Sequence, residues 1–552
     1  MILTGSMDPD ATDSIENLPA SDLIRLVRDL VGVVGVLRAE NETLKVALGK
    51  LRAEHQIVKD ELARLKNLPP RPPIKASGMD KATQRGGGPG TDGKKGPRST
   101  RRRGSQLDKL TIGQTIVVKA KAPDGSRHKG YEDIVVQDLS LSPTATLYRR
   151  ERWETPDGAA IVADLAPGIV GGYGPNLHRL ILMLNTQGQM TCERILALLN
   201  DMGVVISKRQ VVRLLTTKLE IFRDEDEAVL KAGLVGDYVM VDDTGARHAG
   251  KNGYATQIGS DRFCVFRSGP GKSRQAFLSR LSGGTSLYVI NPAALEYMQE
   301  RALPQIVIDK FRVFKDRVFA SREAWETCLN GLGLSEMKVT PDPVLIATEA
   351  ALWGAIRHQG FLSNTVIVSD DAGQFRVGLH ALCWVHAERL VHKLVPANEK
   401  QRNAIEIAKR MIWWLYGGLK EYKLAPNIDQ AEILRSRFDR IFKRARTGYA
   451  TLDSLLRRLF RNKAELLLVL ERPEIPLNTN ATKYDIRAYV MKRKISGGTV
   501  SERGREARDV MLGLYKTCRK QGLSFYHFIG DRLGIPGPKI PTLATLVRPA
   551  LA

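Results

Sequence analysis

The chain has 552 residues, 43% of them hydrophobic, and carries 84 Lys and Arg against 60 Asp and Glu, a net charge of +24. This length exceeds what one core usually serves, so roughly two to four domains are expected. The positive excess favours a polyanionic partner, and nucleic acid is the first candidate. No apolar run approaches the roughly 20 residues that cross a bilayer, which excludes a membrane-spanning protein and predicts a cytoplasmic one. The five cysteines are scattered without a CxxC pair, which indicates reduced thiols.

The N-terminal part divides into a tail and a long heptad repeat. Residues 1–20 are acidic and polar, which predicts a disordered tail. Apolar residues then recur in heptads across residues 23–65, within a helix expected over 21–68, and Asn41 stands at one seam position. Leucine at one seam position, with Val and a single Asn at the other, is typical of a parallel two-stranded coil, so this leucine zipper predicts a homodimer or higher oligomer. The alternative is an amphipathic helix that packs on its own chain.

A basic linker follows the zipper. Residues 69–110 begin with two prolines that end the helix, and they contain Arg101, Arg102 and Arg103. Their many glycines and few apolar side chains cannot build a core, so a flexible segment is expected. Its positive charge suits DNA phosphates, whereas the alternative is a plain soluble spacer.

The hydrophobic period changes to two in residues 111–165. Apolar side chains alternate with polar ones in three runs, at 115–119, 131–136 and 145–153. Such alternation is the pattern of strands with one buried face. A small antiparallel β-module is therefore expected.

Helical periodicity returns in residues 166–230. Thr191 and Ser207 are suited to cap two short helices separated by a glycine-containing turn. The second helix would bury its apolar side chains and expose the cations Lys208, Arg209 and Arg213. This pattern fits a helix-turn-helix that docks in the major groove of DNA. Any two packed helices share it, so the basic charge of the chain supplies the main support.

Two apolar strands each end in a pair of acids before a glycine. Asp242 and Asp243 follow the first strand, and Asp370 and Asp371 follow the second. If the strands lie side by side, their carboxylates meet, and such a site could hold two Mg²⁺ ions about 3.5–4 Å apart that act on a phosphodiester. The alternative is that these aspartates are ordinary turn formers.

The expected core spans residues 231–500. Two further strands before residue 270 extend the first acid strand into an antiparallel meander. Mostly helical stretches at 273–360 and 387–470 read as insertions into an α/β core. C-terminal helices and a tail are expected at 501–552.

A cluster of possible metal ligands follows the second acid pair. It contains His380, Cys383, His386 and His392 at close spacing. Zinc needs four partners, and no second pair stands nearby at a familiar spacing. A packing role at a strand-to-helix junction is therefore the better interpretation.

A second basic run contains Arg487, Lys492, Arg493 and Lys494 and ends at a glycine pair. The backbone at glycines can approach a phosphate closely, and arginine binds phosphate in a bidentate manner. These cations are therefore candidates for DNA binding. A solvated basic face fits the local sequence equally well.

Five motifs, in this order, resemble a DDE-type transposase of the insertion sequence 66 family. They are Tyr131-Glu-Asp-Ile-Val-Val-Gln-Asp-Leu; Ile206-Ser-Lys-Arg-Gln-Val; Val241-Asp-Asp-Thr; Ser369-Asp-Asp-Ala-Gly with Cys383-Trp-Val-His386; and Pro476-Leu-Asn-Thr-Asn480 onward through Arg493-Lys-Ile-Ser-Gly-Gly498. The resemblance implies an α/β RNase H-like core with helical insertions, preceded by a coiled coil, a small β-module and a helix-turn-helix. It also implies an enzyme that cuts and joins double-stranded DNA at element ends and target.

The family's core holds Mg²⁺ or Mn²⁺ with an Asp, Asp, Glu triad. The resemblance assigns the two aspartates, as catalytic and metal-binding residues, to Asp242 and Asp370. The glutamate belongs to a pattern like Pro-Leu-x-x-Asn-x-x-Glu-Arg-x-x-Arg. In the matching run from Pro476 to Arg487, the third-acid position is Lys483.

Lys483 changes the expected chemistry. An ammonium cannot ligate a metal and opposes a second cation, so we expect a catalytically weak or dead chain. Asp485 lies about 200° around the helix from position 483 and is a poor substitute. No cysteine precedes Cys192, so the family's zinc-binding cysteines are also missing and zinc is not expected. The alternatives are a non-catalytic dimeric DNA-binding regulator or degenerate transposase, and a general nuclease of the same fold.

Overall fold

The computed structural model describes residues 111–121, 123–165, 168–283, 287–314, 316–443 and 446–548, together with parts of 21–43. One compact unit contains residues 1–76 and 395–404, and a second contains the remainder. The described part of the predicted zipper is helical. The tail, the rest of the zipper and the linker with Arg101, Arg102 and Arg103 lie outside the described residues. No helix within the described residues is long and apolar enough to cross a membrane.

Residues 111–165 are mainly irregular. The strands predicted at 115–119 and 131–136 do not form, and the third predicted run contributes only its end to β1 (Arg152–Glu154), which pairs antiparallel with β2 (Ala160–Val162). The apolar side chains of the first two runs are exposed in the structure. Alternation produces a strand only where a second strand supplies hydrogen bonds and a surface to bury against, and the described residues offer none there.

Three helices pack around a small core of their own. They are α3 (Pro175–Thr186), α4 (Cys192–Asp201) and α5 (Lys208–Thr216). The side chains of Thr191 and Ser207 cap α4 and α5 by accepting hydrogen bonds from the backbone amides three residues on. The buried side chains that hold the helices together are Ile181, Ile195, Leu199, Ile206, Val211 and Leu214. Helix α6 (Leu219–Gly233) then leads into the sheet.

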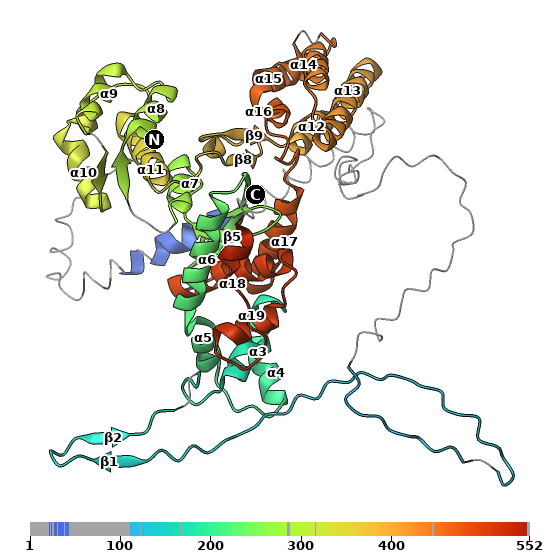
Figure 1. Cartoon of the computed structure of the whole chain (residues 1–552). Helices are drawn as coiled ribbons and strands as arrows, with labels where there is room; N and C mark the ends of the chain where they lie inside the picture. Colours follow the sequence, from blue (N-terminus) through green and yellow to red (C-terminus); the bar gives the residue numbers. More distant parts are fainter. Residues whose placement is uncertain are drawn as a thin grey trace. The chain divides into compact units, whose positions relative to one another are not determined.

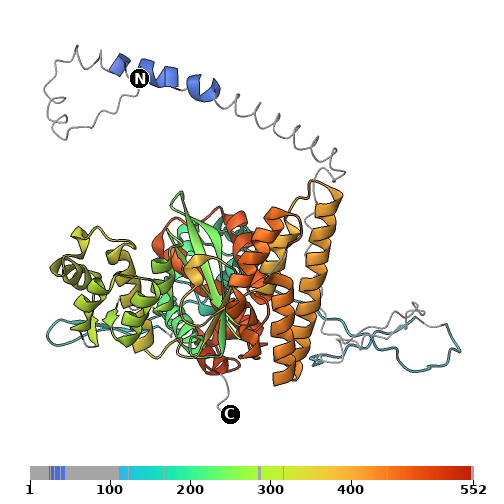
Figure 2. The same cartoon turned by 90° about the horizontal axis from the view of Figure 1, so that it is seen from above.

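A five-stranded mixed sheet forms the centre of the larger unit (Figures 1 and 2). Its order is β5-β4-β3-β8-β9. The first three strands form the predicted antiparallel meander, and β8 and β9 run parallel to β3. The strands are β3 (Tyr238–His248), β4 (Lys251–Gly259), β5 (Cys264–Gly269), β8 (Val366–Ser369) and β9 (His380–Leu382). The chain therefore has an α/β core.

Helical segments separate the strands and follow them. Between β5 and β8 lie α7 (Arg274–Leu281), α8 (Pro292–Glu300), α9 (Gln305–Arg312), α10 (Arg322–Gly331) and α11 (Pro343–His358), with the short strands β6 (Tyr288–Ile290) and β7 (Arg317–Phe319). After β9 come α12 (Trp384–His392), α13 (Glu399–Leu424), α14 (Ile428–Phe442), α15 (Ala450–Arg461) and α16 (Lys463–Leu467). The C-terminal helices are α17 (Asn480–Ser496), α18 (Glu502–Lys520), α19 (Phe525–Arg532) and α20 (Leu543–Val547).

The two faces of β3 have different neighbours. Val239 and Val241 belong to the main hydrophobic core. Ala246 packs in a smaller cluster with Tyr489 of α17. Because side chains alternate along a strand, Asp242 lies on the same face as Ala246, the face that α17 covers.

Candidate active site

The register of the two parallel strands β3 and β8 places two acids beside each other. Met240 pairs with Val368. Asp242 and Asp370 each stand two residues further on, so they continue this register at the same edge of the sheet. The structure therefore brings together the two aspartates that the sequence singled out.

Asp242 is a strongly perturbed acid. Burial raises its pKa to about 6; the Asp370 carboxylate also raises it, while the imidazole of His386 lowers it. One carboxylate oxygen accepts a hydrogen bond of 2.8 Å from the Asp243 backbone amide. His386 and Asp370 therefore both lie within electrostatic range of Asp242.

Two helices begin at this edge of the sheet. The Cys383 amide, at the start of α12, donates to the Ser369 carbonyl at 2.8 Å. The Thr479 amide, at the start of α17, donates to the Cys383 sulfur at 3.3 Å. Burial raises the pKa of the Cys383 thiol, but a hydrogen bond and charge from His386 and a contact with Thr479 bring it down to about 7. The sulfur thus joins the first turns of α12 and α17.

Lys483 lies in the first turn of α17, and its charge acts on the imidazole of His386. Its ammonium donates to the Asn480 side-chain oxygen at 3.1 Å. The pKa of His386 is raised overall. Burial and the charge of Lys483 lower it, but the contacts with Cys383 and the charge of Asp370 raise it more. Lys483 and Asp370 therefore both lie within electrostatic range of His386.

The second acid of each pair is anchored away from this point. Asp243 accepts hydrogen bonds from the Thr256 hydroxyl at 2.5 Å and from the Gln374 amide at 3.1 Å. Asp371 accepts from Arg376 at 2.7 Å and from Arg458 of α15 at 2.8 Å. The two second acids thus hold loops and helices in place around the site.

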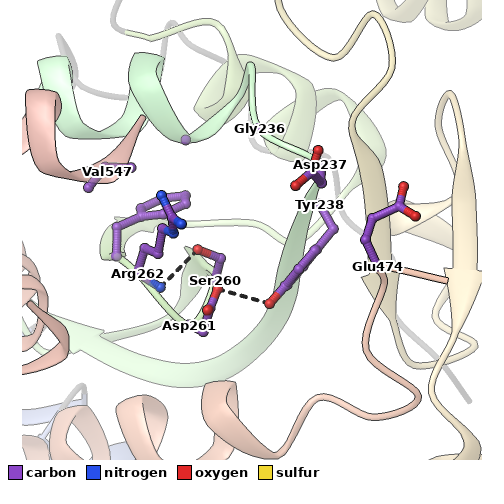
Figure 3. A pocket seen from close by; sticks show the side chains of 10 residues that line it. Gly236, Asp237, Tyr238, Ser260, Asp261, Arg262, Glu474 and Val547 are labelled. Atoms are coloured by element: carbon purple, nitrogen blue, oxygen red, sulfur yellow. Dashed lines mark hydrogen bonds between the residues drawn. The ribbon is translucent and has the colours of Figure 1, made fainter. Parts of the chain in front are cut away.

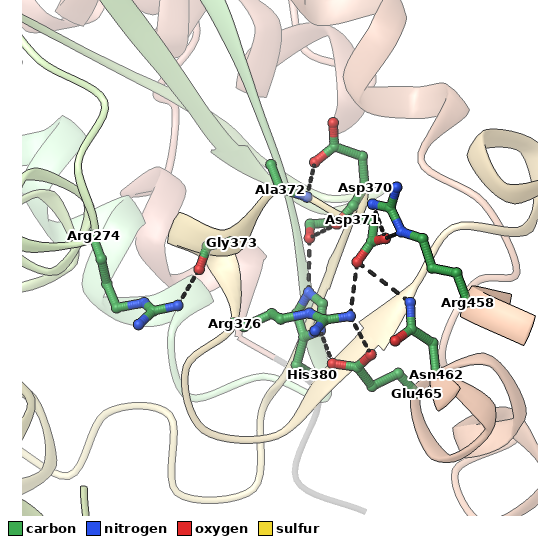
Figure 4. A network of polar contacts seen from close by, with 11 residues as sticks. Arg274, Asp370, Asp371, Ala372, Gly373, Arg376, His380, Arg458, Asn462 and Glu465 are labelled. Carbon is green, nitrogen blue, oxygen red and sulfur yellow. Dashed lines mark hydrogen bonds and ion pairs between the residues drawn. The ribbon is translucent and has the colours of Figure 1, made fainter. Parts of the chain in front are cut away.

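A chain of hydrogen bonds supports the Asp370 loop from below (Figure 4). The Ser369 hydroxyl lies 2.7 Å from His380 Nε2 and 2.6 Å from the Asp370 carbonyl, and His380 Nδ1 lies 2.9 Å from Glu465 of α16. Glu465 also binds Arg376 at 2.9 Å. This resembles a Ser-His-acid triad in geometry, but Ser369 is fully buried and no substrate can reach it. Sequence analysis missed Glu465, because it lies far along the chain from its partners.

Two carboxylates that lie near position 483 in the sequence bind basic side chains. Asp485 binds Lys520 of α18 at 2.8 Å, and Glu471 binds Arg435 at 3.5 Å. Among the described residues, no group of three or more His, Cys, Asp or Glu side chains is arranged to hold a metal ion. Two carboxylates beside an ammonium do not fit the two-cation site that the resemblance implied.

The predicted DNA-binding cations fall into two groups. Lys208, Arg209 and Arg213 are exposed on α5, although Lys208 pairs with Glu193 at 2.6 Å. Arg487 and Lys494 are exposed on α17. These side chains are accessible to a partner.

Lys492 and Arg493 have partners within the protein. Lys492 is buried and donates to the carbonyls of Asn185 and Met190, and burial lowers its pKa to about 8. Arg493 donates to the Gly245 carbonyl of β3. Both contacts join α17 to neighbouring elements, and the helical pattern alone did not indicate them.

A cavity of about 220 Å³ lies at the other end of β3 (Figure 3). Its polar lining includes Tyr238, whose hydroxyl donates to Asp261 at 2.9 Å. Asp242 stands four residues further along the strand, roughly 13 Å away. The cavity is therefore separate from the acid site.

The comparisons with known proteins place part of the chain in a transposase family. Residues 361–507 match the Transposase IS66 family, a segment that includes Asp370, Cys383, His386 and Lys483 but not Asp242. The Uncharacterized protein y4jO of Sinorhizobium fredii (strain NBRC 101917 / NGR234) is 51% identical over 320 residues, which cover 58% of this chain and 99% of that protein. The chain belongs to the IS66 transposase family.

Proposed function

We propose that this protein binds the ends of an insertion sequence as a dimeric transposase with an RNase H-like core, and that its cutting and joining step is weak or absent. The observation that carries the second part is the place of Lys483. It lies in the first turn of α17, at the third-acid position, within electrostatic range of the same imidazole as Asp370. Its ammonium opposes the cation that the two aspartates would attract.

DNA binding is supported by charge and by the three-helix unit. The net charge of +24 favours a polyanion. Helix α5 presents Arg209 and Arg213 to solvent, as the second helix of a helix-turn-helix must. Dimerisation is supported by seam residues of the predicted zipper, because Val27, Val34 and Leu37 are exposed in the single chain.

The two aspartates retain part of the family's chemistry. With a third carboxylate, Asp242 and Asp370 would hold Mg²⁺ or Mn²⁺, which activates an attacking oxygen and stabilises the leaving oxygen. In this chain the proposed metal ligands are two carboxylates, Asp242 and Asp370. Burial and the neighbouring Asp370 carboxylate raise the pKa of Asp242, and His386 lowers it.

A cleavage and strand-transfer assay on the element's own ends tests the proposal. We expect little product from the natural protein with Mg²⁺ or Mn²⁺, and at least a tenfold increase for Lys483→Glu. Lys483→Gln removes the charge without supplying a ligand and should stay inactive, and adding Asp242→Asn to Lys483→Glu should abolish the gain. Robust cleavage by the natural protein would contradict the proposed loss of activity.

A further inference from the structure

The tip of the β3–β4 hairpin is a two-stranded ribbon that extends beyond the sheet. β8 pairs with residues 238–240 of β3, and β5 begins its pairing with β4 at Tyr254. Residues 245–248 and 251–253 therefore have ladder partners only in this hairpin, apart from one bridge between His248 and Thr499. The hairpin is the long pair of green strands in Figure 2. At about 3.3 Å per residue, the tip extends roughly 10 Å past the sheet.

The ribbon is held in a fixed position by the loop after α17. The Thr499 amide donates to the Arg247 carbonyl at 3.1 Å, and the Ala249 amide donates to the Thr499 carbonyl at 2.8 Å. Gly498 makes this close approach possible: its φ is +135°, and a Cβ there would lie 2.6 Å from the Arg247 carbonyl oxygen. The glycine pair thus brings the chain against a strand, and the ribbon cannot swing freely.

The two stretches that form the ribbon and the loop beside it contain almost no acidic residues. Between Asp243 and Glu296 the sequence has one acidic residue, Asp261, and between Asp485 and Glu502 it has none. Glu502 pairs with His248 at 2.8 Å. The exposed cations of these stretches are Arg247, Lys251, Arg262, Lys272, Arg487 and Lys494, of which Arg262 lines the cavity at the other end of β3.

Cations stand on both faces of the ribbon. Arg247 pairs with Asn252, and Gly245 with Tyr254, so Arg247 and Tyr254 share one face. The Lys272 ammonium lies 5.2 Å from the centre of the Tyr254 ring, on that face. Lys251, opposite His248, belongs to the other face, which it shares with Ala246 and therefore with the packed helix α17.

We propose that this ribbon tip, residues 245–253, enters the major groove of duplex DNA, with Arg247, Lys251 and Lys272 on the flanking phosphates. The groove of B-DNA is about 12 Å wide and about 8.5 Å deep, and it admits a two-stranded ribbon. Cations on both faces match the two phosphate strands that border a groove. The inference rests on the proposed function for its partner, but this contact is separate from the helix-turn-helix.

The test is the salt dependence of DNA binding by full-length protein, measured by fluorescence anisotropy on duplex DNA. The triple variant Arg247→Gln/Lys251→Gln/Lys272→Gln should bind at least tenfold more weakly at low salt. Its slope of log K against log salt should fall by about two to three, because each lost phosphate contact removes about 0.9. A matched control, Lys338→Gln/Lys420→Gln/Arg440→Gln, loses the same charge at other exposed positions and should keep the natural slope.

Two further measurements separate this inference from the proposed function. The variant Arg209→Gln/Arg213→Gln removes two cations from the proposed helix-turn-helix and leaves the ribbon unchanged. If that variant loses affinity while the ribbon triple variant keeps the natural slope, the ribbon inference is overturned and DNA binding by the proposed function stands. If the natural protein fails to bind duplex DNA, both fail. Gly498→Ala should displace the tip without changing charge, so a several-fold loss of affinity in a folded protein supports the ribbon.

Discussion

The two acid pairs share one sequence pattern but are held by different forces. Asp242 and Asp243 lie within β3, whose pairing with β4 continues to His248. Asp370 and Asp371 lie just after β8, which ends at Ser369. The ladder fixes the first pair, whereas ionic contacts with α15 and α16 fix the second. A pair inside a ladder needs little further support, while a pair in a loop depends on distant side chains.

The largest expected effect is that of Asp371→Ala. The change removes the acceptor that Arg376 and Arg458 share, although Arg376 keeps Glu465. The acid side chain is 19% exposed and the arginines are 37% and 48% exposed. Breaking a buried pair costs about 3–5 kcal/mol, and partial exposure of the arginines reduces this to about 2–3 kcal/mol. Urea denaturation measures the loss. A change below about 0.5 kcal/mol would show that α15 does not hold the loop.

A smaller effect of opposite sign is expected for Asp242→Asn. Burial raises the folded-state pKa of Asp242 to about 6, above its ordinary value of 3.8, so the folded state binds more protons between these values. Stability therefore rises as pH falls from 6 toward 4, and the charged carboxylate destabilises the fold above pH 6. The asparagine variant should be more stable by on the order of 1–3 kcal/mol at pH 8.

The measurement for Asp242→Asn is thermal or urea unfolding across pH 4–8, compared with the natural protein. The advantage should shrink toward zero near pH 4. Asp226 also has a pKa raised to about 6 by burial, but it is present in both proteins and cancels in the difference. A gain in stability that does not change with pH would have a cause other than the loss of this carboxylate's charge.

Local patterns predicted the fold where neighbours in sequence are also partners in space. The caps at Thr191 and Ser207 and the meander that follows Asp242 depend on residues a few positions apart. The strands predicted at 115–119 and 131–136 failed for the opposite reason, since a strand exists only with a partner that its own sequence does not specify.

The site was predictable only in part for the same reason. Strand ends followed by acids indicated Asp242 and Asp370, and the family pattern indicated position 483. Glu465 reaches His380 only because an insertion folds back onto β9. Lys492 looked like one cation of a basic run, but it is buried against two backbone carbonyls, one at the end of α3 and one in the turn that follows it.

The smallest expected effect is that of Asp243→Asn. Its direct donors are an uncharged hydroxyl and an uncharged amide, and the asparagine oxygen can still accept from Thr256. The Arg280 guanidinium loses a nearby negative charge but keeps its own hydrogen bond to the Thr256 hydroxyl. The side-chain NH₂ of the asparagine would face the NH₂ of Gln374, but the Gln374 amide can flip to present its oxygen. The loss in the free energy of unfolding should therefore stay below about 1 kcal/mol. The same urea titration used for Asp371→Ala measures it. Equal losses of stability for the two substitutions would mean that the second acid is equally important in both pairs, so that anchoring by a strand ladder and anchoring by ion pairs do not differ.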